Sequence, residues 1–469
     1  MVYEISLYIF RRDLRLTDNT ALINAIKNSN KIIPLFIFTP TQISTENKYR
    51  SVNAINFMIE SIIDLNSKIK KNNSSHSLWT AYGDEIEIIN KIHNKMKFNA
   101  IYFNMDYSPY ALKRDNLIKS WSDEHNVNLE TFHDVLLLDT LDITAKNGNY
   151  YKVYSQFYKT ALKISIRMPI SSNENGKLPF IKSPEMYKLS NTLKNLNRLS
   201  IIYTDYDQIN TIKGGRTNAL KILKKIHKFK NYDKIRNFPH IETTMLSAHN
   251  KFGTISIREV YYIIKKKTKN KILLSQLYWR DFYYYIGYHF PQLYKYDHLS
   301  KNGYNNFKWD NSKKMFDKWK NGNTGFPIVD AAMRQLNTTG FMHNRCRMIV
   351  AMFLTKDLLI NWKHGEKYFS QKLIDIDRAQ NVGNWNWSSS FGLDHTTFLR
   401  IFNPWTQSLT YDKDAIYIKQ WVNELKDVPT KHIHKWYKYY PEYDIDYPKP
   451  IIDHDVQRKK FIKRYKNLK

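Results

Sequence analysis

The chain has 469 residues, 42% of them hydrophobic, which is enough for a large buried core and two or three domains. Its one cysteine, Cys346, excludes an internal disulfide framework and any multi-cysteine metal or iron–sulfur site, so no metal is expected. The net charge of +30 favours a polyanionic partner, most simply nucleic acid, although the abundance of Lys, Asn, Ile and Tyr indicates a composition bias. With no export signal and no apolar run near the roughly 18 residues of a membrane helix, we expect a cytoplasmic protein without membrane contact.

The first third of the chain alternates short apolar runs with helical patterns. Strands are predicted at 5–10, 31–38, 77–82, 100–104 and 129–133, and helices between them, for example at 53–71 and 85–95. This alternation predicts a doubly wound α/β domain with a parallel sheet over residues 1–135. The first strand is not followed by G-x-G-x-x-G, so the sheet itself predicts no dinucleotide.

After the sheet, residues 136–200 are predicted to connect two domains, because Pro169, Pro179 and Pro184 lie among Ser, Asn, Gly and Lys. From residue 201 to 469 strand signals nearly vanish, and an all-α domain is predicted. Its helical patterns cover 216–228, 256–266, 273–288, 327–336, 343–359 and 366–374. The basic tail from Asp453 onward is expected to fray.

The helical half also carries four distinctive segments. They are GFPIVDAAMRQL at 325–336, GFMHNRCRM at 340–348, DIDRAQNVGNWNWSS at 375–389 and RIFNP at 400–404. Together with FRRDLRLTDN at 10–19, they closely resemble the DNA photolyase/cryptochrome family, and within it the bacterial class I photolyases that repair cyclobutane pyrimidine dimers. The resemblance runs essentially end to end. It implies an α/β domain followed by a helical FAD-binding domain, FAD as cofactor, UV-damaged DNA as substrate and a monomeric enzyme.

The segment Thr243–Ser247 offers hydroxyls and backbone amides at a predicted helix start, which suits an anion as well as an ordinary helix cap. The resemblance makes it the cradle of the FAD diphosphate. Two positions depart from the family pattern: Met245 stands where Arg is common, and Leu273 where Trp is frequent. The resemblance assigns FAD contacts to Tyr232, Thr243, Thr244, Met245, Leu246, Ser247, Leu273, Arg347, Asp375, Ile376, Asp377 and Asn381.

On the predicted helix from 343, the spacing of Asn344, Arg347 and Met348 puts them near one face. The resemblance implies that Arg347 pairs with Asp375 beside the flavin and that Asn381 lies at the central ring nitrogen. Met348 stands where six-four photolyases have His, which favours cyclobutane dimers as the substrate. Asn381 stands where plant cryptochromes have Asp, which favours repair over signalling. The implied contacts with DNA are Arg236, Gln276, Trp279, Arg280, Asn344, Arg345, Met348, Trp387 and Gln407.

Several tryptophans fall at functional positions of the family. Trp309, Trp362 and Trp385 correspond to a relay that passes electrons from the surface to the flavin, although buried tryptophans are usually core residues. Trp279 and Trp387 correspond to the aromatic pair that holds the extruded dimer.

Other functions stay open at this point. Gln276 stands where dimer photolyases usually have Glu and where six-four photolyases have Gln, so a six-four photolyase is an alternative. A cryptochrome-type receptor and an unrelated basic flavin- or nucleotide-binding protein are two more. The resemblance also allows an antenna, 5,10-methenyltetrahydrofolate, at Tyr110, Ala111 and Lys295, although Tyr110–Ala111 replaces the Asn–Glu pair of folate-binding relatives.

Overall fold

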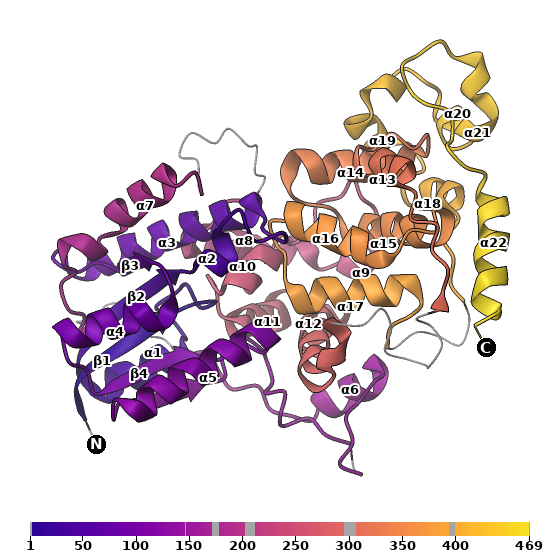
Figure 1. The fold of residues 1–469 in the computed structure, drawn as a ribbon. Helices are drawn as coiled ribbons and strands as arrows, with labels where there is room; N and C mark the ends of the chain where they lie inside the picture. The colour runs from indigo at the N-terminus through magenta and orange to yellow at the C-terminus, as the bar shows by residue number, and fades with distance from the viewer. Residues whose placement is uncertain are drawn as a thin grey trace.

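The computed structural model describes residues 2–145, 147–170, 178–201, 212–294, 306–393 and 399–468. A sheet with flanking helices forms the N-terminal part, and helices form the rest (Figure 1). Within the described residues, no helix is both long and apolar enough to cross a membrane.

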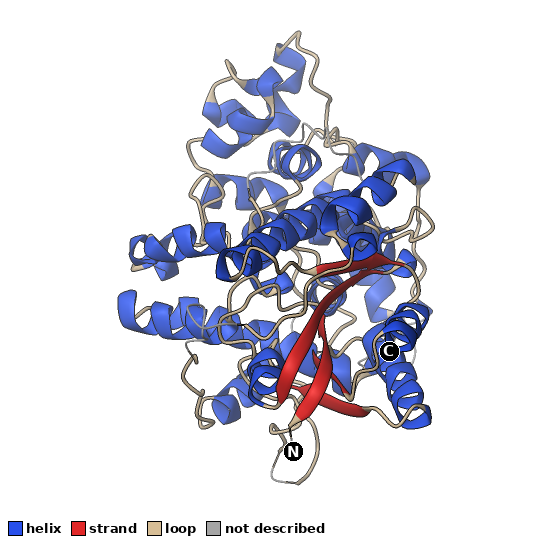
Figure 2. Ribbon diagram, turned by 90° about the vertical axis from the view of Figure 1, so that its left-hand side faces the viewer, coloured by secondary structure: helices blue, strands red, loops and turns tan. Residues whose placement is uncertain are grey.

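The sheet contains five parallel strands in the order β3-β2-β1-β4-β5. They are β1 (Tyr3–Phe10), β2 (Ser29–Phe38), β3 (Trp79–Tyr82), β4 (Ala100–Asn104) and β5 (Asn128–Phe132). Every predicted strand is present, within a few residues of its predicted bounds. The central strands β1 and β2 are buried along most of their length, as expected for a parallel sheet covered on both faces (Figure 2).

Helices cover both faces of this sheet, which confirms the doubly wound α/β fold. Alternate residues of β1 point to opposite faces. Tyr8 and Phe10 pack with the side that carries α1 (Thr20–Lys27) and α3 (Val52–Asn72). Leu7 and Ile9 pack with the side that carries α4 (Glu85–Lys95) and α5 (Pro109–Glu124).

The predicted connector is more structured than its composition indicates. It contains α6 (Tyr154–Ala161), the 3-10 turn η1 (Glu185–Tyr187) and α7 (Leu189–Arg198). Phe180 forms a parallel bridge with Ile32 of β2 and is buried in the sheet's core. The second half of the connector is therefore part of the N-terminal domain.

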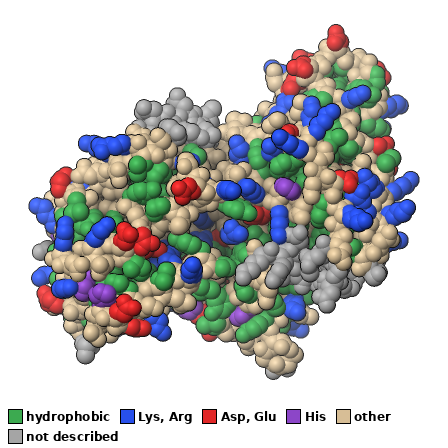
Figure 3. Space-filling view, in the orientation of Figure 1, with side chains coloured by type: hydrophobic (Ala, Val, Ile, Leu, Met, Phe, Trp, Pro, Cys, Tyr) green, Lys and Arg blue, Asp and Glu red, His purple; other side chains and the backbone are tan. Residues whose placement is uncertain are grey.

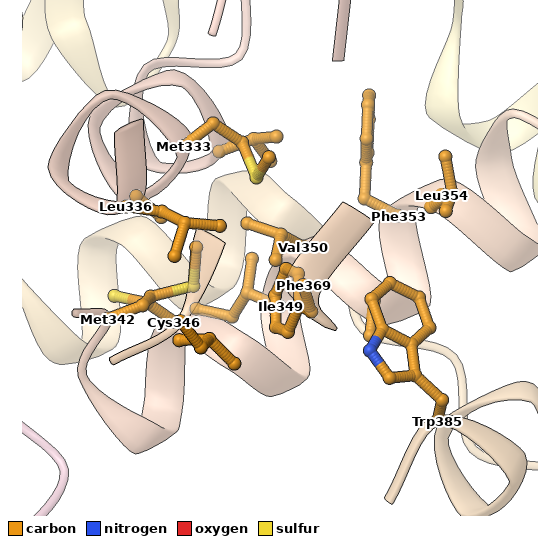
Figure 4. Close-up of a cluster of buried hydrophobic side chains, with 14 of the residues drawn as sticks. Met333, Leu336, Met342, Cys346, Ile349, Val350, Phe353, Leu354, Phe369 and Trp385 are labelled. Carbon is orange, nitrogen blue, oxygen red and sulfur yellow. The ribbon is translucent and has the colours of Figure 1, made fainter. Parts of the chain in front are cut away.

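The helical half is built around one apolar core, part of which is shown in Figure 4. Its first ten α-helices in the described residues are α8 (Arg216–Lys224), α9 (Tyr232–Ile235), α10 (Ser247–Phe252), α11 (Ile257–Lys267), α12 (Lys271–His289), α13 (Lys313–Lys320), α14 (Pro327–Thr339), α15 (Asn344–Met352), α16 (Trp362–Lys372) and α17 (Arg378–Ser389). Beyond them lie α18 (Pro404–Tyr411), α19 (Ile416–Trp421), α20 (Thr430–Ile433), α21 (Trp436–Tyr439) and α22 (His454–Lys466).

Two predictions about helix ends are wrong. The pattern over 343–359 is not one α-helix, because α15 ends at Met352 and a π-helical turn, η5 (Phe353–Asp357), follows it. The tail does not fray, because α22 is anchored at its start and middle. Its His454 Nδ1 lies 2.6 Å from the buried Asp357 Oδ1, and Phe461 is fully buried.

The loop after β1 joins the two domains through buried ion pairs. Arg258 of α11 donates from Nε to Asp18 Oδ2 at 2.8 Å and from Nη2 to Asp134 Oδ1 at 2.6 Å. Arg15 also pairs with Asp134. Gly253, with φ of 61°, lets the loop approach closely, since a Cβ there would lie 2.0 Å from the Arg12 carbonyl oxygen.

Candidate functional site

A cavity that is partly open to solvent lies in the helical half, and its empty space, part of the adjoining solvent included, is about 1540 Å³. It is lined by residues of α10, α12, α15, α16 and α17 and by the segments that precede α10 and α17. All twelve residues predicted to contact FAD line this one cavity, together with Gln276, Arg280, Asn344, Met348 and Trp385.

The segment Thr243–Ser247 forms one wall of the cavity. Met245 has a left-handed backbone, with φ of 53°, and Leu246 follows in a right-handed conformation. Successive residues of opposite hand direct their N–H groups toward a common point, which makes a concave site for an anion. This arrangement depends on the backbone alone, so it does not need a basic side chain at Met245.

Arg347 and Asp375 meet on the cavity wall. Arg347 donates from Nη2 to Asp375 Oδ2 at 2.8 Å and from Nε to the Met342 carbonyl at 2.8 Å. The other carboxylate oxygen, Asp375 Oδ1, is buried and has no hydrogen-bond partner within the described residues, and the same holds for Asn250 Oδ1. A buried acceptor without a donor costs about 1–3 kcal/mol, so these atoms fit a ligand that supplies N–H or O–H groups.

Asp377 has two neighbours that fix its charge. Its Oδ2 accepts a hydrogen bond from Arg12 Nη2 at 2.5 Å and another from the Tyr284 hydroxyl. Burial alone would raise the pKa of Asp377, but Arg12 and Arg280 outweigh it and hold the pKa at about 2. The carboxylate therefore stays ionised, and it ties the cavity wall to the N-terminal domain through Arg12.

Asn381 and Trp385 lie one turn apart on α17 and both line the cavity. Asn381 Nδ2 donates to Glu366 Oε1 and to the Glu366 carbonyl, both at 2.9 Å, which fixes the orientation of the amide. The Trp385 ring lies in a seat made by Gly365, where a Cβ would come within 2.2 Å of Trp385 Cη2.

Three further polar residues line the cavity. Gln276 donates from Nε2 to the Ile272 carbonyl at 3.0 Å, and Asn344 is exposed at the start of α15. Arg280 donates from Nη1 to the Val135 carbonyl at 2.7 Å, so its guanidinium is also part of the joint between the domains.

Five residues predicted to bind DNA do not line the cavity. Trp279 stacks on Tyr154 with ring centroids 3.5 Å apart, and Arg345 donates to Asn237 Oδ1 at 2.8 Å. The others are Arg236, which lies over the Tyr232 ring, Trp387, whose ring lies below the Arg400 guanidinium, and Gln407 on α18.

The remaining predicted residues are spread over both domains. Trp362 is buried at the start of α16, and Trp309 is half-buried against Phe307, with ring centroids 4.5 Å apart. Tyr110 is exposed at the start of α5, followed by the buried Ala111, and Lys295 lies outside the described residues.

Some lining residues were missed by the sequence analysis. Asn250, Lys251, Gln380, Asn384 and Ser388 all line the cavity. Gln380, Asn384 and Ser388 continue the four-residue spacing of the α17 face and could have been found from it. Asn250 and Lys251 carry no such signal, because they follow the predicted cradle in a region with no helical pattern.

Two family models match most of this chain. The model described as "DNA photolyase" matches residues 6–174, and the model described as "FAD binding domain of DNA photolyase" matches residues 273–467. The chain belongs to the DNA photolyase family. Membership agrees with the fold, because the first match covers the α/β domain and the second covers most of the cavity-forming helices.

Similar proteins span the whole chain. The deoxyribodipyrimidine photo-lyase of Buchnera aphidicola (subsp. Acyrthosiphon pisum) is 36% identical, over 98% of this chain and 96% of the relative. The Escherichia coli protein of the same name is 32% identical, over 97% of each. Among solved structures, an archaeal photolyase from Sulfolobus tokodaii with two FAD molecules superposes with a TM-score of 0.86, at 35% identity over 99% of this chain and 100% of that one. A cryptochrome from Synechocystis is 25% identical with a TM-score of 0.85, over 99% of both chains.

The cavity fits the FAD that this domain type binds. The backbone of Met245 and Leu246 suits the diphosphate, and the unpartnered Asp375 Oδ1 suits a donor group of the cofactor. Leu273, Phe369 and Trp385 supply apolar and aromatic surface for a flat ring system. Within the described residues, no group of three or more His, Cys, Asp or Glu could hold a metal ion.

Proposed function

We propose that this protein is a deoxyribodipyrimidine photolyase, which uses light to split cyclobutane pyrimidine dimers in DNA. The observation that carries this proposal is the single cavity into which both sets of residues project: Asp375 and Asn381 on the cofactor side, Gln276, Asn344 and Met348 on the lesion side. When bound, reduced FAD supplies a light-excited electron donor. The names of the similar bacterial proteins support the same activity.

The chain's own residues then bind the cofactor, orient it and shield it from water. The backbone of Met245 and Leu246 holds the diphosphate, and the Arg347–Asp375 pair positions a carboxylate toward the cofactor. Glu366 fixes the amide of Asn381, and burial raises the pKa of Glu366. The apolar wall excludes water, which strengthens each of these polar contacts.

DNA is proposed to bind at the mouth of the cavity. Arg345 follows the lining residue Asn344, and Arg236 lies over the ring of the lining residue Tyr232. Gln407 lies on α18. Lys and Arg side chains are spread over the face in Figure 3, most densely at its right-hand edge over α22. Such contacts with phosphates position the duplex and do not read its sequence.

A six-four photolyase is the second candidate, and Gln276 favours it. That reaction needs a proton donor beside the lesion. His343, the histidine adjacent to Asn344, instead caps α15, its Nδ1 accepting from the Arg345 N–H at 3.1 Å. Burial, together with the neighbouring arginines, lowers the pKa of His343 to about 4, so this imidazole is neutral at pH 7. We therefore assign the protein to cyclobutane dimers.

The test uses two oligonucleotides that carry either a cyclobutane dimer or a six-four photoproduct. Each is illuminated with the reduced FAD-bound protein, and the products are separated. We expect restoration of the dimer substrate only, and Gln276→Glu should keep or raise this activity. Restoration of the six-four substrate alone would replace the proposal by the second candidate. Binding of FAD without repair of either lesion would favour a photoreceptor, as the similarity to a cryptochrome allows.

An antenna chromophore is a separate proposal. Tyr110 and Ala111 have no carboxylate to offer to a folate. The Tyr110 hydroxyl lies 3.2 Å from Thr41 Oγ1, and Ala111 is buried. The Sulfolobus relative with two FAD molecules, described as implying a novel light-harvesting cofactor, supports a flavin as another option. The absorption spectrum of the purified protein distinguishes folate, flavin and no antenna.

A further inference from the structure

Lys251 is a cation of the cavity to which neither the resemblance nor the comparisons give a role. It lies in the last turn of α10, four residues after Ser247, and therefore on the same helix face as the end of the cradle. Its backbone carbonyl accepts from Arg12 Nε at 3.0 Å, which holds this turn against the N-terminal domain. Its side chain lines the same cavity as Asp375 and Asp377.

The three basic residues that line the cavity differ in their partners. Arg347 is paired with Asp375, and Arg280 donates to two backbone carbonyls, those of Val135 and Asn250. Within the described residues, the Lys251 amine has neither an ion pair nor a hydrogen bond, and the contact it does make is with the Phe252 ring, whose centroid is 4.3 Å away. Met245, in the cradle itself, contributes no charge.

The electrostatic surroundings of Lys251 agree with this geometry. Burial and, to a smaller extent, Arg12 lower its pKa to about 8, because the opposing effect of Asp377, Asp106 and Asp375 does not compensate. A cation that is withdrawn from water and has no anionic partner is costly. A negatively charged ligand in the cavity would remove that cost.

We infer that Lys251 supplies the positive charge that favours the reduced, anionic state of the bound flavin ring. This inference rests on the proposed function for the identity of the ligand. The ring, and not the diphosphate, is the expected partner for two reasons. The cradle already offers backbone N–H groups to the diphosphate, and Lys251 senses the two lining carboxylates, Asp375 and Asp377, that the resemblance places beside the ring. Arg347 and Arg12 already pair with those carboxylates, so the charge of Lys251 is left to act on the ring.

The redox state separates the two possible partners. The diphosphate carries the same charge whether the ring is oxidised or reduced, so a cation bound to it strengthens both states equally. A cation beside the ring strengthens the reduced state more. By linkage, the difference in affinity between the two states equals the shift in the midpoint potential of the bound flavin.

The experiment compares wild type, Lys251→Met, Lys251→Arg and Lys266→Met. Lys266 is exposed on α11 and does not line the cavity, so its variant is the matched control for the loss of one charge. For each protein, the dissociation constant of oxidised FAD and the midpoint potential of bound FAD are measured, together with urea unfolding of the FAD-free protein.

We expect Lys251→Met to weaken the affinity for reduced FAD relative to oxidised FAD by about tenfold, which lowers the two-electron potential by about 30 mV. Lys251→Arg should keep the wild-type potential, and Lys266→Met should not change it. The FAD-free Lys251→Met protein should be as stable as wild type or more so, because an unpaired, partly buried charge is removed. A structural role would instead lower its stability.

An unchanged potential in Lys251→Met would overturn the inference, and equal weakening of both redox states, including complete loss of FAD, would assign Lys251 to the diphosphate instead. Neither result bears on the proposed function, provided that the wild type binds FAD and repairs dimers. A wild type that binds no FAD would remove the basis of both.

Discussion

Two buried polar regions of this molecule, the joint between the domains and the cavity, use similar side chains in different ways. In the joint, Arg258 bonds both Asp18 and Asp134, and within the described residues the side-chain donors and acceptors of these three groups all find partners. In the cavity, Asp375 Oδ1 and Asn250 Oδ1 are buried without a partner, and within the described residues the Lys251 amine forms no ion pair. Unpaired buried atoms also occur outside the cavity, so the contrast applies to these two clusters: the unpaired cavity groups are available to a ligand, and the paired joint groups serve stability.

The difference follows from what each region must accomplish. The charged groups in the joint lose their water once, on folding, and several charge-assisted hydrogen bonds offset the desolvation cost of each charge. Groups in the cavity must remain available, so their compensation arrives only with the ligand. Mutations should therefore affect folding in the first region and binding in the second.

The largest effect is expected in the joint. Arg258→Met should lower the free energy of unfolding by about 3–5 kcal/mol, because it leaves two buried carboxylates with fewer cationic partners. Urea denaturation followed by tryptophan fluorescence measures the loss. The control is Lys31→Met, which removes an exposed pair with Glu4 and should cost about 0–1 kcal/mol. Equal losses in the two variants would contradict the structural role of the joint.

Asp377 belongs to both regions, and its titration tests how strongly Arg12 and Arg280 stabilise the ionised carboxylate. Burial opposes its ionisation, but Arg12 and Arg280 hold its pKa at about 2, below the 3.8 of an ordinary Asp. The resulting stabilisation, about 2 kcal/mol, is complete above about pH 4 and is lost as the pH falls through about 2. Wild type should therefore lose this stability between pH 4 and 2, and Asp377→Asn should lack that part of the pH dependence.

Unfolding by urea at several pH values checks this prediction, with Asp123→Asn, an exposed carboxylate on α5, as the control. If the pH profiles of Asp377→Asn and wild type coincide, Arg12 contributes no net stabilisation through this carboxylate.

In the cavity, Asp375→Asn should mainly affect the cofactor. Its loss of charge weakens the contact with Arg347 and changes the unpartnered oxygen that faces the ligand. We expect at least a tenfold weaker affinity for FAD, about 1.4 kcal/mol, with a smaller effect on the FAD-free protein. Fluorescence titration with FAD and urea unfolding without it separate the two. A loss of stability as large as that of Arg258→Met, with unchanged affinity, would erase the distinction between the regions.

Much of this organisation could be predicted from the sequence, because it depends on local patterns. Alternating apolar runs predict all five strands, and the spacing of Asn344, Arg347 and Met348 predicts that they share a face, which opens on the cavity. The family resemblance extended this to Tyr232 and Asp375, which lie far apart in the chain.

What could not be predicted depends on tertiary contacts. The π-turn after Met352 and the order of α22 arise together, because His454 reaches back to Asp357 in that turn. The position of Trp279 against Tyr154 depends on a helix within the predicted connector. Lys251 is distinguished because its amine forms no ion pair within the described residues. Sequence patterns indicate which residues are neighbours along a helix or strand, and they do not indicate which charges stay unpaired in a cavity.

The smallest effect on folding and binding is expected for Trp385, which belongs to both the core and the cavity (Figure 4). Its ring is buried against Phe369, with centroids 5.0 Å apart, and over Gly365. Trp385→Phe keeps an aromatic ring in this position and should cost only about 1 kcal/mol of stability, with FAD still bound. An indole is oxidised more easily than a phenyl ring, so the variant should nevertheless slow light-driven reduction of the bound flavin by an external reductant. Repair by protein that was reduced beforehand should persist, because the proposed relay restores the cofactor and does not split the dimer. Loss of repair in the pre-reduced variant would instead place Trp385 in the repair step itself, and unchanged photoreduction would exclude it from the relay.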